Sequence, residues 1–521
     1  MAGDWHKERH YNGGMGIYRV TDRRDPKFPD GAFWDLVNMV YDRESDNPEV
    51  MRGGTRVGST AMGGDVTGLF DYNNGSRLVA TCEDGKIYEY VSSDWAVVSG
   101  ARATGNDTTV TTRWAAEMFY GATTTANLLI MGNGVDNLAR FDTTNGAVAL
   151  GGSPPSAATF PTAWQGKLWV ATGSIIYYSA TNNCEDWTSG GGGGNIVIYR
   201  GFDGNVTGLA AFANNLFIFK RSSIYRIAPT GTLSDISIVK NVDMETGCVN
   251  HNTIKEAGPE GGKYLTFLSE RGVMAIVTSA SSAGFSVIPL DRWIKPILDS
   301  RNKDRTDVAF AVWNADRKEY WLHYPSGAAT LPNDAVISNF AKGRLPPRWT
   351  RCNLPNFTSG IVFNEGNTDY VHYLGDTAGK VYQMHVGTAT TVDGQPVTGT
   401  VKEKFYTQGE PESMKEYGWS FVDIETDGDY SVSVSQQMYR PGLSSSSANV
   451  HAPDFSEQDS DWGVGQWGVA LWGGSGDRGQ RLRPKYVRRA SGMSHIINCG
   501  RWFRYRGVVI ASAIKADNIA A

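Results

Sequence analysis

Three tryptophans stand at a constant spacing of five residues near the C-terminus, at Trp462, Trp467 and Trp472. This is not a helical spacing, and on a strand it places Trp467 on the face opposite the other two. Exposed indole rings can stack on sugars, whereas buried rings anchor a core or a subunit contact. The glycine, valine and alanine residues between them let the backbone of a partner approach closely. Core packing or an interface is the commoner use of tryptophan, and sugar binding stays open.

The charge of the same region is segregated along the sequence. From Glu410 to Asp461 there are eleven acidic residues and two basic ones, whereas from Asp477 to Gly507 there are nine basic residues and one acidic residue. These charges either pair within their own domain, or meet complementary edges of identical copies in a ring, or contact DNA. The basic residues that we single out for an interface, together with the three tryptophans, are Arg478, Arg481, Arg483, Arg488 and Arg489.

Motifs for catalysis or metal binding are not found in the sequence. There is no HExxH, no GxSxG and no phosphate loop, since the run Gly190–Gly194 lacks the required lysine and hydroxyl residue. Asp423, Glu425 and Asp427 begin like a calcium loop, but Val434 stands where a bidentate glutamate is needed, so we expect a hairpin turn. We therefore predict no catalytic residue, no cofactor and no metal site, and a protein that is not an enzyme.

Composition narrows the class of protein further. The net charge of −5 is small for 521 residues and argues against a general polyanion binder. The five cysteines are far apart and never in a CxxC pair, so we expect them to be reduced and buried after synthesis in a cytoplasm. No apolar run opens the chain, and none approaches the ~20 residues that span a bilayer, so we predict neither a signal peptide nor a membrane span.

Short β-type runs separated by turn residues fill most of the chain. Many of these runs pair into hairpins, as where Asp84 and Gly85 supply the positive φ angles of a tight turn. Sustained helical periodicity is nearly absent, and 33–44 and 291–300 are the best short helix candidates. The seven predicted hairpins cover 77–90, 127–141, 167–179, 215–227, 264–276, 319–340 and 370–384.

A second marker shows that the hairpins belong to a repeat. Similar segments precede them, such as DVTGLFDY (65–72) before the first hairpin and NVTGLAAF (205–212) before the fourth. A unit of roughly 40 to 50 residues with about four short strands is typical of a β-propeller blade. We predict an all-β protein with a propeller of about seven blades, six to eight being allowed.

The parts outside the repeat are expected to form separate units. Residues 1–60 are predicted to provide strands that lead into the first blade, and 61–404 the β-propeller. Residues 405–521 contain strand-like runs between serine-rich and glycine-rich loops, and we expect an antiparallel β-sandwich-like interaction domain.

The segment NMVYDRESDNPEVMRGGTRVG (38–58) resembles the opening of large β-propeller proteins of tailed-phage virions, where such a segment forms strands just before the first blade. The runs YYSATNNCEDWT and EYWLHYPSG resemble blades of those proteins, and DWGVGQWG and RWFRYRGVVI resemble their C-terminal sandwich. This resemblance covers most of the chain in style and order, and it brings no catalytic residues with it.

The resemblance implies a structural protein of a short-tailed phage virion, the tail nozzle or packaged-DNA stabilisation protein. Proteins of that family form a ring, commonly a hexamer, below the portal and adaptor, where they retain the genome and extend the DNA channel. The partners it implies are copies of the chain, the portal or adaptor and other tail proteins, and viral DNA that passes through the lumen without sequence-specific binding. The implied location is the virion tail, after synthesis in the host cytoplasm.

Two functions from other classes remain open. One is a carbohydrate-binding propeller for receptor recognition, which a glycan array on the purified protein would reveal. The other is a glycosidase, because propellers also carry such sites and carboxylates are plentiful in this chain. Assays with generic sialosides and aryl glycosides separate it from the structural function.

Replacing Trp467 by alanine tests the use of the tryptophan segment. If the rings anchor a core or an interface, the variant loses folding stability or ring assembly and leaves sugar binding unchanged. Thermal unfolding, particle size and a glycan array measure the three properties. A variant that assembles normally and loses glycan binding would instead favour the carbohydrate-binding function.

Overall fold

The computed structural model describes most of the chain. The described residues are 6–10, 14–42, 45–100, 113–120, 127–199, 203–229, 239–259, 262, 264–278, 284–343, 345–354, 357–365, 369–407, 412–427, 430–439, 447–451, 478–482 and 489–514.

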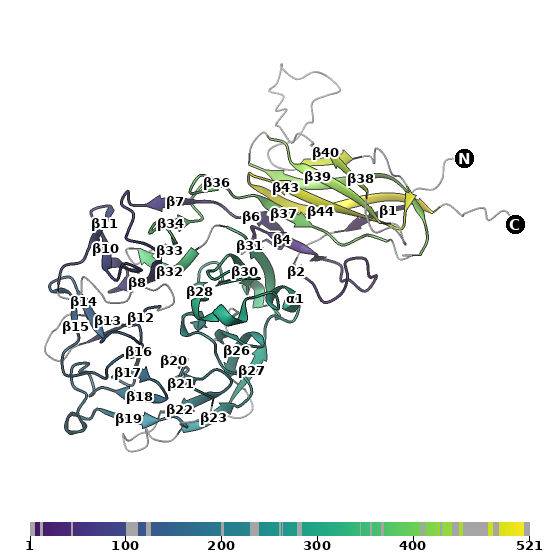
Figure 1. Cartoon of the computed structure of the whole chain (residues 1–521). Coiled ribbons are helices and arrows are strands. Elements are labelled where there is room, and N and C mark those ends of the chain that lie inside the picture. Colours follow the sequence, from purple (N-terminus) through teal and green to yellow (C-terminus); the bar gives the residue numbers. More distant parts are fainter. Residues whose placement is uncertain are drawn as a thin grey trace.

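Seven four-stranded units form a ring, and a two-sheet domain projects from its rim (Figure 1). From the axis outward, blade 1 contains β8 (Val66–Tyr72), β9 (Arg77–Cys82), β10 (Ile87–Val91) and β11 (Asp94–Val97). In the same order, blade 2 contains β12 (Ala115–Tyr120), β13 (Asn127–Gly132), β14 (Ala139–Asp142) and β15 (Gly146–Ala149). Blade 3 contains β16 (Thr159–Trp164), β17 (Lys167–Thr172), β18 (Ile175–Tyr178) and β19 (Gly194–Val197). Blade 4 contains β20 (Gly208–Phe212), β21 (Asn215–Phe219), β22 (Ile224–Ile227) and β23 (Val239–Asp243).

Blades 5 to 7 complete the ring. Blade 5 contains β24 (Lys255–Glu256), β25 (Tyr264–Ser269), β26 (Gly272–Thr278) and β27 (Phe285–Pro289), and blade 6 contains β28 (Phe310–Asn314), β29 (Glu319–Tyr324), β30 (Asp334–Asn339) and β31 (Arg348–Cys352). Blade 7 contains β32 (Phe357–Glu365), β33 (Asp369–Asp376), β34 (Val381–Met384) and, from the N-terminal part of the chain, β7 (Gly54–Val57). The prediction of a seven-bladed, all-β propeller is confirmed. All seven predicted hairpins correspond to the second and third strands of their blades. They could be predicted because a tight turn fixes how the two strands that it connects pair.

The blades are held together by alternating hydrophobic side chains. On β13, Leu128 and Ile130 pack toward blade 3, whereas Leu129 and Met131 pack toward blade 1. Successive side chains on a strand point to opposite faces, so a blade whose middle strand is apolar throughout buries both faces against its neighbours. The same arrangement recurs around the ring. Separate apolar clusters lie between blades 7 and 1, between blades 3 and 4, and between blades 4 and 5.

The N-terminal segment closes the ring. Strand β7 pairs antiparallel with β34, so that Val57 lies opposite Val381 and blade 7 receives its fourth strand. Residues 54–57 thus lie in the propeller, although the sequence assigned 1–60 to a segment that precedes it. Because blade 7 takes its strands from both ends of the repeat array, it closes the ring and gives this last blade its full four strands.

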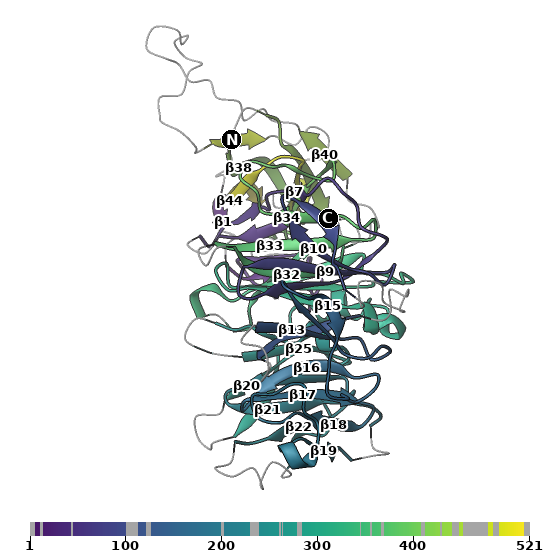
Figure 2. The ribbon, with the colours of Figure 1, turned by 90° about the vertical axis from the view of Figure 1, so that its left-hand side faces the viewer.

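The projecting domain is a sandwich of two mostly antiparallel sheets (Figure 2). One sheet contains β1 (His6–His10), β5 (Met39–Tyr41), β6 (Pro48–Val50), β38 (Lys415–Thr426), β41 (Arg478–Leu482), β42 (Arg489–Ala490) and β44 (Phe503–Ile514). The other contains β4 (Asp35–Val37), β37 (Gly399–Lys402), β39 (Ser433–Tyr439), β40 (Ser447–His451) and β43 (Gly492–Cys499). The predicted terminal β-sandwich is confirmed as a fold, but β1, β4, β5, β6 and β37, from outside 405–521, also belong to it. We call this domain the terminal sandwich.

Short elements complete the fold. They are β2 (Gly16–Ile17), β3 (Ala32–Phe33), β35 (Thr391–Val392), β36 (Gln395–Pro396), the helix α1 (Lys295–Leu298) and the 3₁₀ turns 189–191, 251–253, 303–308 and 341–343. Of the predicted helix at 291–300, only the single turn α1 is helical, and the helix predicted at 33–44 is wrong. That segment forms β3, β4 and β5, because Asn38 has a left-handed φ of 53° that breaks a helix and both sides of the segment are buried.

Gly379 allows a test of the ring closure. It has a φ of +71°, and a Cβ there would lie 2.2 Å from the carbonyl oxygen of Met62 in the loop that follows β7. We expect Gly379→Ala to lower the free energy of unfolding by about 2 kcal/mol more than Gly327→Ala. Gly327 is the matched control, since its φ is +63° and no atom lies within 4 Å of its Cβ position. Equal losses in urea unfolding would contradict a tight closure at this turn.

Candidate functional site

Most of the residues singled out for an interface lie outside the described residues. Trp462, Trp467, Trp472, Arg483 and Arg488 lie outside the described residues. The backbones of the other three are strand residues of one sheet of the terminal sandwich. Arg478 and Arg481 pair with Ile424 and Phe421 of β38, and Arg489 pairs with Glu416.

Part of the basic stretch is used inside the terminal sandwich. Arg504 forms ion pairs with Glu49 at 2.6 Å and Glu425 at 3.3 Å, and Arg506 reaches Glu425 at 2.9 Å. Burial raises the pKa of Glu49, and the adjacent Arg504 opposes that shift. For Arg504 and Arg506, the structure therefore shows the first of the three alternatives, which is pairing of charges within their own domain.

A continuous sheet joins the terminal sandwich to blade 6. Val37 of β4 pairs in parallel with Arg351 of β31 on one side and antiparallel with Thr400 of β37 on the other. Blade 6 and one sheet of the sandwich therefore form a single eleven-stranded sheet. The hydrophobic core is also shared, because one apolar cluster runs from Leu268 in blade 5 through Trp321 in blade 6 to Tyr505 in the sandwich.

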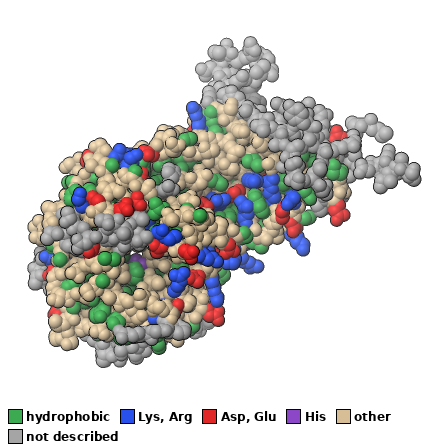
Figure 3. All heavy atoms as spheres, in the orientation of Figure 1, with side chains coloured by type: hydrophobic (Ala, Val, Ile, Leu, Met, Phe, Trp, Pro, Cys, Tyr) green, Lys and Arg blue, Asp and Glu red, His purple; other side chains and the backbone are tan. Residues whose placement is uncertain are grey.

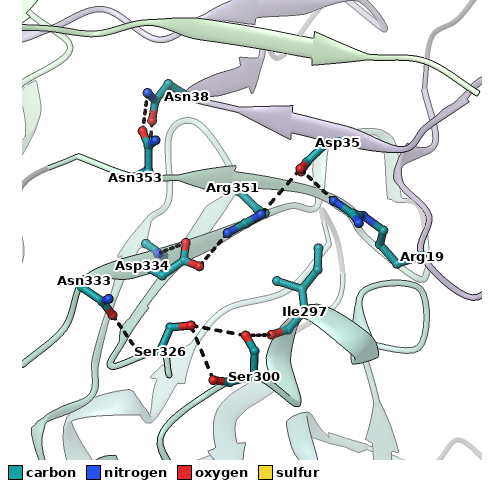
Figure 4. A network of polar contacts seen from close by, with 11 residues as sticks. Arg19, Asp35, Asn38, Ile297, Ser300, Ser326, Asn333, Asp334, Arg351 and Asn353 are labelled. Carbon is teal, nitrogen blue, oxygen red and sulfur yellow. Dashed lines mark hydrogen bonds and ion pairs between the residues drawn. The ribbon is translucent and has the colours of Figure 1, made fainter. Parts of the chain in front are cut away.

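Polar side chains fix the register of this junction (Figure 4). Arg351 lies between two carboxylates, 2.8 Å from Asp334 and 3.5 Å from Asp35, and Arg19 binds Asp35 at 2.7 Å. Burial opposes the charge of Arg351, but Asp334 and Asp35 outweigh it and raise the pKa of the guanidinium. Charge-assisted contacts of this kind are directional, so the junction resists both sliding and rotation.

Asn38 makes a second lock at the same place. Its amide nitrogen donates to Asn353 Oδ1 at 2.7 Å and to the carbonyl oxygen of Thr398 at 3.0 Å, while its Oδ1 accepts from the backbone N–H of Asn353 at 3.0 Å. These bonds connect the N-terminal segment, blade 6 and the sandwich through a single buried side chain. We call the contacts of Arg19, Asp35, Asn38, Arg351 and Asn353 the junction network.

A buried polar chain inside the terminal sandwich escaped the sequence reasoning. His495 Nδ1 lies 2.8 Å from Glu403 Oε2, and His495 Nε2 lies 2.9 Å from Ser420 Oγ. Gln436 also donates to Ser420 at 2.8 Å, and the hydroxyl of Tyr505 donates to the other oxygen of Glu403. Ser420 and Tyr505 lie on strands of one sheet, Gln436 and His495 lie on strands of the other, and Glu403 directly follows β37, so the chain connects the two layers.

The order serine, histidine and carboxylate is that of a catalytic triad, but its surroundings are not. Ser420, His495 and Glu403 are all fully buried, at 0% exposure, so a substrate has no access to the hydroxyl in this conformation. A hydrogen-bonded polar chain in a core instead specifies how two layers face each other. We interpret these residues as an internal clasp, and no local sequence motif could have revealed it.

A cluster of histidines lies between blades 6 and 7. His323, His372 and His385 pack around Trp321, and burial lowers the pKa of all three imidazoles, that of His323 and of His372 to about 3. They are therefore neutral packing groups at neutral pH. Within the described ranges, no three histidine, cysteine or carboxylate side chains are arranged to hold a metal ion.

The five cysteines are buried and make no disulfide. Among the residues that can be placed, no helix is long and apolar enough to cross a membrane.

Comparisons with known proteins give a fold likeness without a family. No protein-family model matches the chain, and no curated protein matches it. Among solved structures, the WD40 repeats of RRP9 match with a TM-score of 0.40 and 9% identity, over 64% of this chain and 99% of that one. U3-55K matches with a TM-score of 0.40 and 8% identity, over 64% of this chain and 98% of that one.

A third structure matches over a longer part of this chain. The extracellular domain of the hybrid two-component system BT4673 from B. thetaiotaomicron has a TM-score of 0.38 and 8% identity. The match covers 70% of this chain and 42% of that one, so the chain spans less than half of that protein's length. Likenesses this distant carry no functional argument.

We expect the internal clasp to stabilise the fold and Ser420 to be chemically unreactive. Ser420→Ala should lower the free energy of unfolding by about 1–3 kcal/mol, because it removes one buried hydrogen bond from His495 and one from Gln436. Ser286→Ala, on an exposed strand position of blade 5, is the control and should change it by less than about 0.5 kcal/mol. The native protein should not be labelled at Ser420 by a fluorophosphonate, and stoichiometric labelling there would contradict the interpretation.

Proposed function

We propose that the protein is a structural component of a short-tailed phage virion, which assembles as a ring of identical copies below the portal and adaptor. In this function the propeller is a rigid wall element and the terminal sandwich supplies contacts between subunits. The ring retains the packaged genome and extends the channel through which DNA leaves. The sequence resemblance in 38–58, in the blades and in the C-terminal part supports this assignment.

The observation that carries the proposal is the eleven-stranded sheet. A protein that contains pressurised DNA must transmit load between its parts without hinging. The sheet, the shared apolar core and the junction network replace the flexible linker that usually separates two domains. A load on the terminal sandwich therefore reaches the ring of blades directly.

A channel that lets DNA slide should carry little excess positive charge. Acidic and basic side chains are interspersed on the face in Figure 3, and the chain is slightly acidic overall. A lumen that bound many phosphates through lysine and arginine would hold DNA tightly and oppose its exit. We therefore propose that DNA contacts are weak and independent of sequence.

Particle size in solution, with negative-stain images, tests the proposal. The purified protein should form closed rings with a central hole in a concentration-dependent manner. The double substitution Arg478→Glu with Arg481→Glu should weaken assembly by about tenfold or more, since it reverses the charge of one candidate edge. The matched control is Arg292→Glu with Lys303→Glu, which reverses two exposed charges of the propeller and should leave assembly unchanged.

Two results would overturn this function. One is a protein that remains monomeric at high concentration and in the presence of its neighbouring virion proteins. The other is a ring whose lumen is lined with lysine and arginine in a density map. Unfolding curves of both double variants show whether any loss of assembly is merely a loss of folding.

A further inference from the structure

Three imidazoles lie at the seam where the ring of blades closes. His323 is on β29 of blade 6, His372 is on β33 of blade 7, and His385 directly follows β34. Blade 7 is completed by β7, whose Gly54 pairs with Met384, the residue before His385. The histidine cluster is therefore next to the strand pairing that closes the ring.

The imidazoles pack against aromatic rings and against one another. The centroid of the Trp321 ring lies 5.0 Å from that of His372 and 5.4 Å from that of His385, and the two histidine rings are 5.8 Å apart. His323 stacks on Phe310 with a centroid distance of 4.6 Å. Flat, apolar surroundings of this kind accommodate a neutral imidazole well, but they replace the water around a charged one poorly.

Four ring nitrogens of the cluster have no hydrogen-bond partner in the described part of the chain. They are Nε2 of His323, Nε2 of His385 and both nitrogens of His372, and all four are buried. A protonated imidazole donates from both of its nitrogens. Protonation within the closed ring would therefore create a buried cation whose N–H groups lack acceptors.

The charged groups on the blade 6 side do not favour an added proton. Burial lowers the pKa of His372 and of His385, and the positive charge of Arg317 lowers both further. The carboxylate of Glu319 already accepts from Arg317 at 3.2 Å and from the indole of Trp321 at 3.1 Å. Arg113, whose Cζ lies 5.9 Å from the Phe310 ring centroid, is a further cation on this side.

The blade 7 side brings no negative charge to the cluster from its two closing strands. Tyr382 of β34 stays neutral, because burial and the carboxylate of Asp376 raise the pKa of its hydroxyl. Arg56 of β7 lies opposite Tyr382 in the strand pairing and is exposed. An imidazolium at the seam would thus meet other cations and neutral rings.

We propose that the histidine cluster is an acid-sensitive latch. It holds blade 7 against blade 6 while its imidazoles are neutral, and it releases the closing pair of β7 and β34 when they take up protons. The open form binds protons more tightly because water solvates the imidazolium there, so acid shifts the equilibrium toward it. The latch acts within one chain and does not depend on the function proposed above.

The pH range of the latch follows from the pKa values of the two forms. An imidazole in water has a pKa of about 6.5. Burial lowers that of His323 and of His372 to about 3. The closed form therefore keeps its full stability above about pH 6.5 and loses it progressively as the pH falls toward 3. Between about pH 7.5 and pH 5, each imidazole that opens to water favours the open form by about thirtyfold.

Hydrogen exchange measured on peptides of the full chain, at about pH 7.5 and pH 5, tests the latch. After correction for the intrinsic pH dependence of exchange, the opening constant of amides in β7 and β34 should rise about thirtyfold or more at the lower pH. Amides of β13, inside blade 2, should change by less than about threefold, because no part of the latch contacts them. An equal rise in β13 would mean general acid unfolding and would overturn the proposal.

The double substitution His372→Phe with His385→Asn should remove most of the rise at the seam. Phenylalanine keeps a flat ring against Trp321, and asparagine tolerates the left-handed φ of 60° at position 385. The control is His10→Asn in the terminal sandwich, which should keep the full rise. If the double variant does not fold, His323→Phe, which preserves the stack on Phe310, should reduce the rise by about thirtyfold. The proposal is overturned if the wild-type seam shows no rise, or if folded variants of the cluster show the same rise as the wild type.

Discussion

The pairing of β4 with β31 is the contact on which the architecture depends. Through Val37, a strand from the N-terminal segment lies between blade 6 and the terminal sandwich and extends one sheet across both. Without that strand, no sheet would run from blade 6 into the terminal sandwich, and only the shared apolar core and side-chain contacts would connect them. Backbone hydrogen bonds on both sides of β4 turn two domains into one body, and the junction network sets their relative angle.

The same short segment has two structural tasks. Residues 35–37 join the propeller to the sandwich, and residues 54–57 close blade 7. Both pairings bring together strands that are hundreds of residues apart, so forming them costs loop-closure entropy that the buried core must offset. A protein that uses one segment for both tasks couples the integrity of its ring to the position of its sandwich.

The repeat could be predicted because its signals are local. Turn residues such as Asp84 and Gly85 register adjacent strands, and apolar strands between them indicate burial on both faces. The apolar spacing at 33–44 also fits a helix, and the segment forms strands instead because Asn38 has a left-handed φ and both sides of the segment are buried. The internal clasp joins Glu403 to His495, 92 residues further along the chain, and no spacing rule connects such positions.

The propeller and the terminal sandwich thus form one rigid body, and hydrogen exchange measured on peptides tests this most directly. If the eleven-stranded sheet is intact in solution, amides of β4, β31 and β37 exchange as slowly as those of β29 inside blade 6. The slow amides of propeller and sandwich should then become exposed together as denaturant is added. Fast exchange at β4 and β37 beside a protected β29, or separate unfolding of the sandwich, would contradict this account.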